Sequence, residues 1–197
     1  FKSNNSETFY YKIRSDFNKN KISGIKRAAA FIYLNKTCFN GLWRVNSKGE
    51  FNVPYGKYND PGIFEKETIL SASKLLQGVE IIKQDYCTIL NKVTSGDFVY
   101  LDPCYDPLKK TSFANYNPNK FSVEDRIKLA KFIGHLNYKN VEFILSNNKI
   151  PEMHILYPKD RFNHKEILAP RFINSNGKKR GKIIELLILP NTHSHVI

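Results

Sequence analysis

Cysteine is scarce in this sequence: its 197 residues include three cysteines, and no two of them form a Cys-x-x-Cys pair. The odd number and wide spacing of Cys38, Cys87 and Cys104 predict neither a structural metal site nor a disulfide framework, so we expect a reducing compartment and no bound metal. Long apolar runs are missing as well, since none approaches the roughly eighteen residues of a membrane span. No signal peptide opens the chain, and no repeat interrupts it. These absences favour a globular chain of the cytoplasm.

Acidic residues are outnumbered, with 18 Asp and Glu against 31 Lys and Arg, which gives a formal net charge of +13 and an isoelectric point near 9.6. Hydrophobic residues make up 41%, a fraction that excludes a disordered chain and suits one domain with a small subdomain. The charge favours a polyanionic partner. Because no membrane signal is present, nucleic acid is the favoured partner, and a basic surface that serves only solubility is the alternative.

An apolar run that ends in a carboxylate, a proline and an aromatic lies near the middle of the chain, at residues 97–105. Residues 98–101 are β-forming and continuously apolar, as expected of a strand that is covered on both faces of a parallel sheet. Open α/β sheets bind ligands beyond the carboxyl ends of their strands, so we expect Asp102 at that edge with its side chain free. Pro103 would end the hydrogen-bond ladder of the strand.

The grouping of Asp102, Pro103 and Tyr105 suits one kind of chemistry. A carboxylate and a nearby backbone carbonyl are both acceptors, and together they can hold both hydrogens of an amino group on an aromatic ring. Tyr105 can stack on the face of that ring, and the amino nitrogen is thereby readied to attack an electrophile. These residues predict a site that methylates an amino group on a flipped base. The alternative is an ordinary Asp-Pro turn at the end of a strand.

Hydrophobic periodicity and turn residues predict an α/β fold, in which strands and crossover helices form a doubly wound sheet that ends in a hairpin. Helices are expected at residues 7–17, after Gly24, at 64–77 and after Ser122. Strands are expected at 79–82, 98–101, 141–145, 162–168 and 183–189. Ser6 is the expected cap of the first helix, and Ser122 with Asp125 has the pattern of a capping box.

Residues 35–58 are dense in aromatics and amides and contain two glycine-bounded turns, which predicts a hairpin or an irregular loop. Arg and Asn side chains are suited to reading guanine and adenine edges, and an aromatic beside Asn40 could wedge into a base stack. A packed hairpin subdomain without ligand contacts is the equal alternative. Asp85 follows the expected strand at 79–82, where an acidic residue often binds a ribose or an adenine, although a turn is the commoner role.

Taken together, these motifs resemble the Dam-type DNA adenine methyltransferases of the group that modifies GATC. The resemblance covers most of the chain. Its matches are Tyr10-Tyr11 with Phe17-Asn18, the segment 34–58, the motif at Asp102, Ser146-Asn147 and the loop Ser175-Asn176-Gly177. It implies a Rossmann-like, S-adenosylmethionine-dependent methyltransferase fold in two parts. These are a DNA-recognition subdomain of helices and a hairpin at 1–62, and the catalytic sheet domain at 63–197.

The resemblance also implies roles for residues of the expected active site. Asp102 and the carbonyl of Pro103 would hold the amino group of the adenine, and Tyr105 would stack on the flipped base. Asp85 and Tyr86, together with Asp102, would contact the cofactor S-adenosylmethionine. The transfer would be direct, with no covalent intermediate and no metal.

For the segment 34–58, the resemblance implies contacts with double-stranded DNA. Phe39 and Asn40 would insert at the point in the base stack that the flipped base leaves. Leu42, Arg44 and Pro54 would contact the bases of the site, and the fork of Arg44 suits a bidentate contact with guanine. No membrane partner is expected, and the protein is expected to be a monomer that acts alone or needs a further N-terminal segment.

Two features depart from the family pattern. Cys104 stands where the family has a second proline, whose fixed φ would stiffen the loop, so impaired but not abolished activity is expected. The glycine-rich strand-to-helix turn that grips the methionine part of the cofactor is absent, since the first glycine is Gly24. The chain therefore resembles the C-terminal portion of such an enzyme, truncated at its N-terminus.

Three alternatives to an adenine methyltransferase stay open. The first is a catalytically incomplete, DNA-binding fragment of such an enzyme. The second is a cytosine-ring methyltransferase, because a Pro-Cys pair supplies the attacking cysteine there, although those enzymes lack the adjoining Asp and Tyr. The third is a methyltransferase that acts on a protein glutamine or on RNA, against which the segment 34–58 argues.

Overall fold

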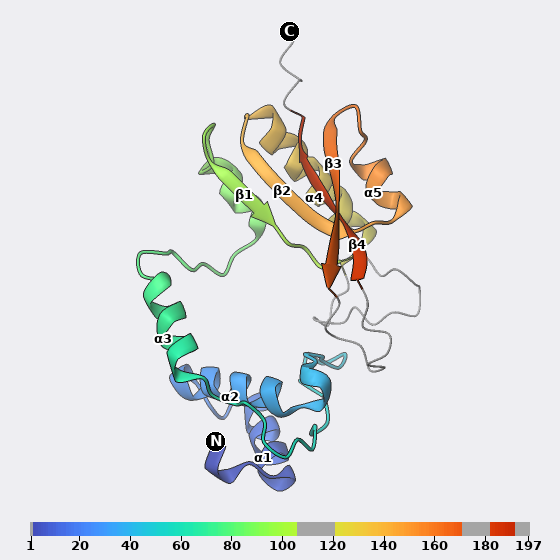
Figure 1. Ribbon diagram of the computed structural model, residues 1–197. Coiled ribbons are helices and arrows are strands. Elements are labelled where there is room, and N and C mark those ends of the chain that lie inside the picture. Colours follow the sequence, from blue (N-terminus) through green and yellow to red (C-terminus); the bar gives the residue numbers. More distant parts are fainter. Residues whose placement is uncertain (1, 106–120, 171–181, 192–197) are drawn as a thin grey trace. The chain divides into compact units, whose positions relative to one another are not determined.

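A computed structural model describes residues 2–105, 121–170 and 182–191, and the chain divides into two compact units (Figure 1). The first unit contains the described residues up to Ile82, and the second contains those from Lys83 onward. The boundary expected from the sequence lies at residue 62, so the two divisions differ in the placement of residues 63–82. The loop Ser175-Asn176-Gly177 lies outside the described residues.

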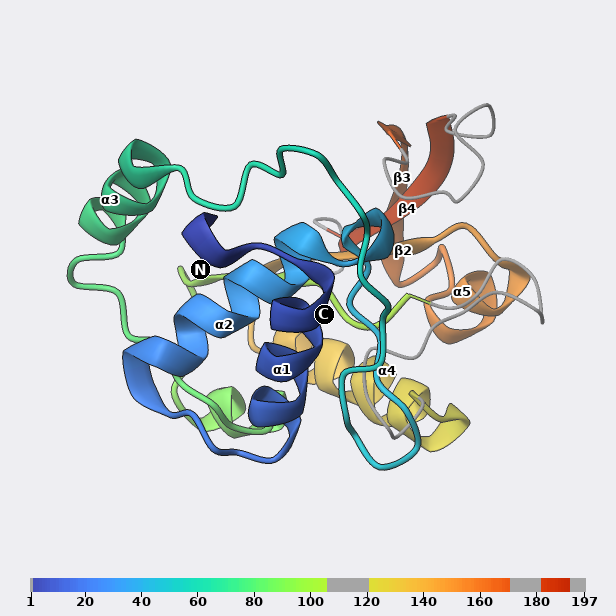
Figure 2. The same ribbon diagram turned by 90° about the horizontal axis from the view of Figure 1, so that it is seen from below.

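The first unit is built on two helices that lie against each other, α1 (Glu7–Asn18) and α2 (Gly24–Thr37) (Figures 1 and 2). The hydroxyl of Ser6 accepts a hydrogen bond from the backbone N–H of Phe9 at 3.2 Å, which confirms Ser6 as the cap of α1. Apolar side chains form one core: Tyr10, Ile13, Phe17, Ala30, Tyr33, Leu34, Cys38, Phe51, Val53 and Ile63. A third helix, α3 (Lys66–Leu75), follows and buries none of its residues.

The segment after α2 forms the expected hairpin. Two isolated antiparallel bridges join its arms: Cys38 with Tyr55, and Val45 with Phe51. Helix α1 holds the second arm, because the side-chain amide of Asn18 pairs with the backbone N–H and C=O of Phe51 at 2.9 and 3.0 Å, as a neighbouring strand would. The hydroxyl of Tyr10 donates to the carbonyl of Val53 at 2.8 Å. The hairpin therefore takes its position from α1 and needs no ladder of its own.

The second unit contains a four-stranded open sheet with the order β1-β2-β4-β3, which gives a mixed α/β fold. Its strands are β1 (Phe98–Leu101), β2 (Glu142–Asn148), β3 (Phe162–Pro170) and β4 (Lys182–Pro190). β1 and β2 are parallel, whereas β4 pairs antiparallel with both β2 and β3. The structure thus confirms the two apolar strands and the closing hairpin that the sequence predicts.

Helix α4 (Val123–Tyr138) packs on one face of this sheet (Figure 1), and the shorter helix α5 (Pro151–Leu156) follows β2. The expected capping box is confirmed: Ser122 Oγ accepts from Asp125 N at 3.1 Å, and the Asp125 carboxylate accepts from Ser122 N at 2.8 Å. The core beneath α4 is continuous: Val99, Leu101, Leu129, Phe132, Ile133, Leu136, Val141, Phe143, Leu145, Met153, Tyr157, Phe162, Leu186 and Ile188. Within the described ranges, no helix has the length and apolar character needed to cross a membrane.

The expected strand at 79–82 is wrong. This segment belongs to no strand, and Val79, Ile81 and Ile82 are 53%, 79% and 45% exposed. A strand needs a neighbour to accept and donate its backbone hydrogen bonds, and no other part of the described chain pairs with these residues. An apolar run shows β-propensity but cannot show whether a partner strand exists.

Two expectations about the sheet also need correction. β1 is covered on one face, since Val99 and Leu101 are buried while Phe98 and Tyr100 are 62% and 60% exposed. The reason is that, among the described elements, α4 packs on the side of β1 that carries Val99 and Leu101. The strand expected at 141–145 is longer than predicted. Ser146, Asn147 and Asn148 belong to β2, which continues in the sheet to Asn148.

Candidate active site

The carboxyl ends of the two parallel strands bring Asp102 and Ser146 together. Leu101 pairs with Leu145 across β1 and β2, so the residues that follow them lie side by side. Asp102 is exposed, as the sequence predicts, whereas Ser146 is only 2% exposed. Ser146 Oγ lies 3.4 Å from Asp102 Oδ1, so a buried hydroxyl of the neighbouring strand contacts the candidate catalytic carboxylate.

Ser146 has further partners. Its Oγ lies 3.2 Å from the hydroxyl oxygen of Tyr100 and 3.5 Å from the carbonyl oxygen of Leu101. A serine hydroxyl carries one hydrogen, so Ser146 can donate to the carboxylate of Asp102 or to the carbonyl of Leu101 but not fully to both. A bond that Tyr100 donates to Ser146 leaves the serine hydrogen for Asp102. This arrangement restrains one carboxylate oxygen and leaves the exposed group able to accept from a ligand.

Tyr105 lies at the same edge, joined to Asp102 by the half-buried residues Pro103 and Cys104. Its hydroxyl donates to Glu185 Oε2 at 3.4 Å. Burial raises the pKa of Tyr105 to about 12, and the negative charges of Glu185 and Asp102 act in the same direction. The ring is therefore uncharged at neutral pH and its hydroxyl is a hydrogen-bond donor.

Asp85 and Tyr86 lie against α4. Asp85 Oδ2 forms an ion pair with Lys128 Nζ at 2.7 Å, and its Oδ1 accepts from the backbone N–H of Cys87 at 2.9 Å. The hydrogen bond from Lys128, followed by that from Cys87, lowers the pKa of the Asp85 carboxyl. The ring of Tyr86 packs edge-on against Phe132 with the centroids 5.1 Å apart, and burial raises the pKa of its hydroxyl. The described residues show no hydrogen bond from this pair to Asp102.

Phe39 lies at the start of the first arm of the hairpin, next to the bridge between Cys38 and Tyr55, and is 49% exposed. The next residue, Asn40, adopts a left-handed conformation with φ 55°, and Gly41 follows with φ 60°. The backbone N–H of Asn40 donates to the hydroxyl of Tyr58 at 3.0 Å. Gly56 allows this approach, since a Cβ there would lie 2.5 Å from the Tyr58 ring and 2.8 Å from the carbonyl oxygen of Cys38. The turn that carries Phe39 is thus fixed by contacts from the far arm.

Arg44 lies on the same hairpin with its side chain held in place. Its Nε donates to Asn52 Oδ1 at 2.7 Å, and its Nη2 donates to the Asn52 carbonyl at 3.3 Å. Leu42 packs at the margin of the core of the first unit, whereas Pro54 is exposed and its carbonyl accepts from the N–H of Phe39 at 2.9 Å. The structure therefore brings Phe39, Arg44 and Pro54 onto one small element.

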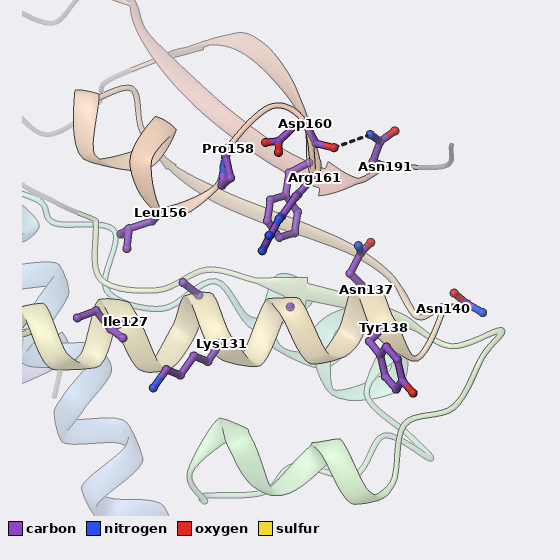
Figure 3. Close-up of a pocket in the computed structure, with 13 residues that line it drawn as sticks. Ile127, Lys131, Asn137, Tyr138, Asn140, Leu156, Pro158, Asp160, Arg161 and Asn191 are labelled. Atoms are coloured by element: carbon purple, nitrogen blue, oxygen red, sulfur yellow. Dashed lines mark hydrogen bonds between the residues drawn. The ribbon is translucent and has the colours of Figure 1, made fainter. Parts of the chain in front are cut away.

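A groove of about 870 Å³ lies elsewhere in the second unit, between α4 and the segment that leads from α5 to β3 (Figure 3). Lys131, Tyr138 and Arg161 line it, and the carbonyl of Asp160 accepts from Asn191 at 3.5 Å across its rim. Asn140, which precedes β2, also lines it, so the groove lies at the amino ends of the parallel strands. It is at the opposite end of these strands from Asp102.

The sequence interpretation missed Glu185 and gave no role to Ser146. Both come from strands distant in sequence from Asp102, and only the strand order brings them to it. A signal for Glu185 is present, because it is the one charged residue in the apolar run 183–190. A single carboxylate in an apolar strand is costly to bury unless it forms a hydrogen bond or reaches solvent.

The comparisons with known proteins identify the family of this chain. The model of the family described as D12 class N6 adenine-specific DNA methyltransferase matches residues 1–171. The type II methyltransferase M.MjaIII of Methanocaldococcus jannaschii is 48% identical over 186 residues, which are 92% of this chain and 64% of that protein. The type II methyltransferase M1.LlaDCHI of Lactococcus lactis subsp. cremoris is 41% identical over 190 residues, 93% of this chain and 66% of that protein. The DNA adenine methylase of Serratia marcescens is 36% identical over 190 residues, 94% of this chain and 68% of that protein.

The mixed α/β sheet, with polar and aromatic side chains at the carboxyl ends of its parallel strands, is of the class that binds ligands at that edge. Within that class, the chain belongs to the D12 family of N6 adenine-specific DNA methyltransferases. It spans 64% and 66% of the length of the first two relatives, about two thirds of each. The expected resemblance to DNA adenine methyltransferases is thereby confirmed.

Proposed function

We propose that the protein transfers a methyl group from S-adenosylmethionine to the amino group of an adenine in duplex DNA, within the sequence GATC. The observation that carries the proposal is the exposed carboxylate of Asp102 beside the half-buried ring of Tyr105 at the carboxyl ends of β1 and β2, in a chain of this family. The adenine reaches this edge only after it leaves the base stack, so the proposal includes base flipping.

Asp102 and Tyr105 have separate tasks in this reaction. The carboxylate of Asp102 and the carbonyl of Pro103 accept the two hydrogens of the amino group, which directs the nitrogen lone pair away from the ring. Ser146, 3.4 Å from Asp102 Oδ1, restrains the carboxylate for this role. The uncharged ring of Tyr105 stacks on the face of the adenine and excludes water from it. Direct transfer needs no covalent intermediate and no metal.

Asp85, Tyr86 and Asp102 are the residues proposed to hold the cofactor. When bound, S-adenosylmethionine supplies an electrophilic methyl group. The residues fit a ligand with ribose hydroxyls and an adenine ring, since Asp85 keeps its carboxylate at the surface. The hydroxyl oxygen of Tyr86 is buried and finds no hydrogen-bond partner within the described part of the chain, so it can serve a polar ligand group.

The hairpin of the first unit is proposed to read the DNA. Phe39 and Asn40 enter the stack at the flipped base, and the exposure of the Phe39 ring on a fixed turn supports this role. Leu42, Arg44 and Pro54 contact the base pairs. We assign residues 1–62 to this recognition subdomain and residues 63–197 to the catalytic domain, whose sheet would be part of a Rossmann-like fold. The protein would act as a monomer in the cytoplasm or on the nucleoid.

A second candidate function is DNA binding without catalysis. It is favoured by the engagement of Asp85, whose two carboxylate oxygens already accept from Lys128 and from the Cys87 N–H. In this version the hairpin and the charge of +13 bind duplex DNA, and no methyl transfer follows.

Calorimetric titration with S-adenosylmethionine, with and without a GATC duplex, distinguishes the two functions. Micromolar binding of the cofactor supports the methyltransferase. Tight, salt-sensitive binding of the duplex without measurable binding of the cofactor supports the second candidate. A duplex that lacks GATC is the control, and equal affinity for both duplexes contradicts the proposed recognition sequence.

The variant Asp102→Ala tests the assignment of the catalytic carboxylate. We expect loss of methyl transfer, because one of the two acceptors for the amino hydrogens is gone, with duplex binding largely retained. Incorporation of labelled methyl groups and a gel-shift titration measure the two properties. Asp160→Ala, an exposed carboxylate at the other end of the sheet, is the matched control. Unchanged turnover in Asp102→Ala would remove Asp102 from the site.

A further inference from the structure

Glu185 is an unusual residue in its strand. It lies on β4 opposite Asn148 and is flanked by the apolar residues Ile184 and Leu186. Its side chain is only partly exposed, and a carboxylate in that position costs free energy unless it finds a donor. The donor that the structure provides is the hydroxyl of Tyr105, 80 residues away in sequence.

The hydrogen bond between Tyr105 and Glu185 restrains the ring of Tyr105, which the backbone between Asp102 and Tyr105 does not fix by itself. Between Asp102 and Tyr105 only Pro103 has a fixed φ, and Cys104 carries no such restriction. The ring of Tyr105 therefore needs a second point of attachment if it is to keep one orientation. The bond to Glu185 supplies this point at the far end of the ring, on a strand paired on both sides. Its length of 3.4 Å is long for a hydroxyl donor, and such bonds often shorten when a substrate is held.

We propose that Glu185 is a positioning residue of the active site, which fixes the ring of Tyr105 for stacking on the adenine by accepting its hydroxyl hydrogen. This inference rests on the proposed function. It assigns no contact with the substrate to Glu185 itself. The charged form of Glu185 suits the role, because an ionised carboxylate accepts a stronger hydrogen bond than a neutral group does.

The electrostatic surroundings of Tyr105 agree with this role. Burial raises the pKa of Tyr105, the negative charges of Glu185 and Asp102 add to this rise, and a hydrogen bond with Ser146 opposes it. The two carboxylates disfavour the phenolate, so Tyr105 keeps the hydrogen that it donates. Glu185 lies on β4, an interior strand of the sheet, and is partly buried. Asp102 follows the last residue of β1 and is exposed.

The first test needs no catalysis. In protein labelled with ¹³C at Cζ of tyrosine, the resonance of Tyr105 is identified by its loss in Tyr105→Phe. We expect Glu185→Gln to shift this resonance, since the amide is a weaker acceptor, and Glu185→Asp to shift it because the shorter side chain falls away from the hydroxyl. Glu142→Gln, an exposed glutamate on β2, is the matched control and should leave the resonance in place. A Tyr105 resonance that is unchanged in Glu185→Gln overturns the inference.

The second test is kinetic and uses a double-mutant cycle. Glu185→Gln and Tyr105→Phe should each lower kcat by about tenfold with little change in the KM for DNA, because the ring remains but its orientation is released. The double variant should be no worse than either single variant, since both remove the same bond. Additive losses, or a loss confined to KM, overturn the inference.

The two tests separate the failure of this inference from the failure of the proposed function. If the protein does not methylate DNA but the Tyr105 resonance shifts as expected, the contact between Tyr105 and Glu185 is supported and the proposed reaction is contradicted. If the Glu185→Gln variant methylates DNA with full activity, the proposed reaction is supported and the positioning role of Glu185 is contradicted. Urea denaturation followed by circular dichroism checks that the second unit, which contains Tyr105, Glu142 and Glu185, is folded in every variant.

Discussion

Arg44, which is proposed to contact a guanine, has a side chain held by two hydrogen bonds to Asn52. Its guanidinium has five N–H donors, and the bonds to Asn52 use one from Nε and one from Nη2. These two bonds fix the plane of the group and direct its remaining donors away from Asn52. A side chain held in this way loses less conformational entropy when it binds a base than a mobile one does.

We predict that Arg44→Ala lowers discrimination at one guanine by about 1–3 kcal/mol, the range for a bidentate contact. The measurement is the difference in binding free energy between a GATC duplex and duplexes with one base pair changed. Lys48→Ala, on the exposed turn of the same hairpin, should weaken binding to all duplexes equally. If Arg44→Ala also weakens all duplexes equally, Arg44 contacts only phosphate.

Residue chemistry alone suggests Asp102 and Tyr105 as candidate site residues, because their types and order are visible along the chain. It could not identify Ser146 and Glu185 as members of the same site, since their approach depends on the strand order β1-β2-β4-β3. Patterns of side chains specify which face of a strand is buried, but not which strands become neighbours. The sequence also could not show that Asp85 is held by Lys128, a contact between residues separated by 43 positions.

At the scale of elements, the sequence predicted correctly those features that depend on contacts between residues close together in the chain. The caps at Ser6 and Ser122 follow from side chains that reach backbone N–H groups three residues away. The expected strand at 79–82 failed because pairing is not local. Its β-propensity is real, but no strand of the described chain lies beside it.

The capping box of α4 leads to a prediction about stability and pH. Ser122→Ala should lower the free energy of unfolding by about 1 kcal/mol at neutral pH. The hydrogen bond from the Ser122 N–H lowers the pKa of Asp125, so the ionised Asp125 stabilises the folded state. This contribution is present above the unfolded pKa of about 3.9 and is lost as the pH falls through the folded pKa.

Urea denaturation at several pH values measures this effect. Asp125→Asn should be less stable than the unchanged protein near neutral pH, and the difference should shrink as the pH falls below about 4. Ser47→Ala, on an exposed turn, is the control for the loss of a serine hydroxyl. A difference for Asp125→Asn that is constant across the pH range would contradict an ionised cap.

At the scale of the whole molecule, the two units have separate cores that share no residue. Trp43 is the single tryptophan and packs on the ring of Phe51 with the centroids 4.5 Å apart, so its emission reports on the first unit. Leu145 is fully buried in the core of the second. Separate cores favour separate unfolding transitions.

We predict that Leu145→Ala destabilises the second unit by about 2–5 kcal/mol and leaves the Trp43 transition unchanged. Circular dichroism and tryptophan emission, followed in the same urea titration, measure the two transitions. Phe51→Ala, which removes a buried ring from the first core, should give the opposite pattern. Equal shifts in both signals for each variant would show that the chain unfolds as one cooperative unit.

The open edge of β1 has a practical consequence for the colloidal behaviour of this chain. Within the described part of the chain β1 is an edge strand, and its residues Phe98 and Tyr100 are more than half exposed, a combination that favours association with another copy. The net charge of +13 opposes that encounter through long-range repulsion. Concentrated salt, the usual means of stripping nucleic acid from a basic protein, shortens the range of this repulsion to about 3 Å at 1 M. Purification steps that clean the protein of DNA are therefore the steps at which it is most prone to aggregate.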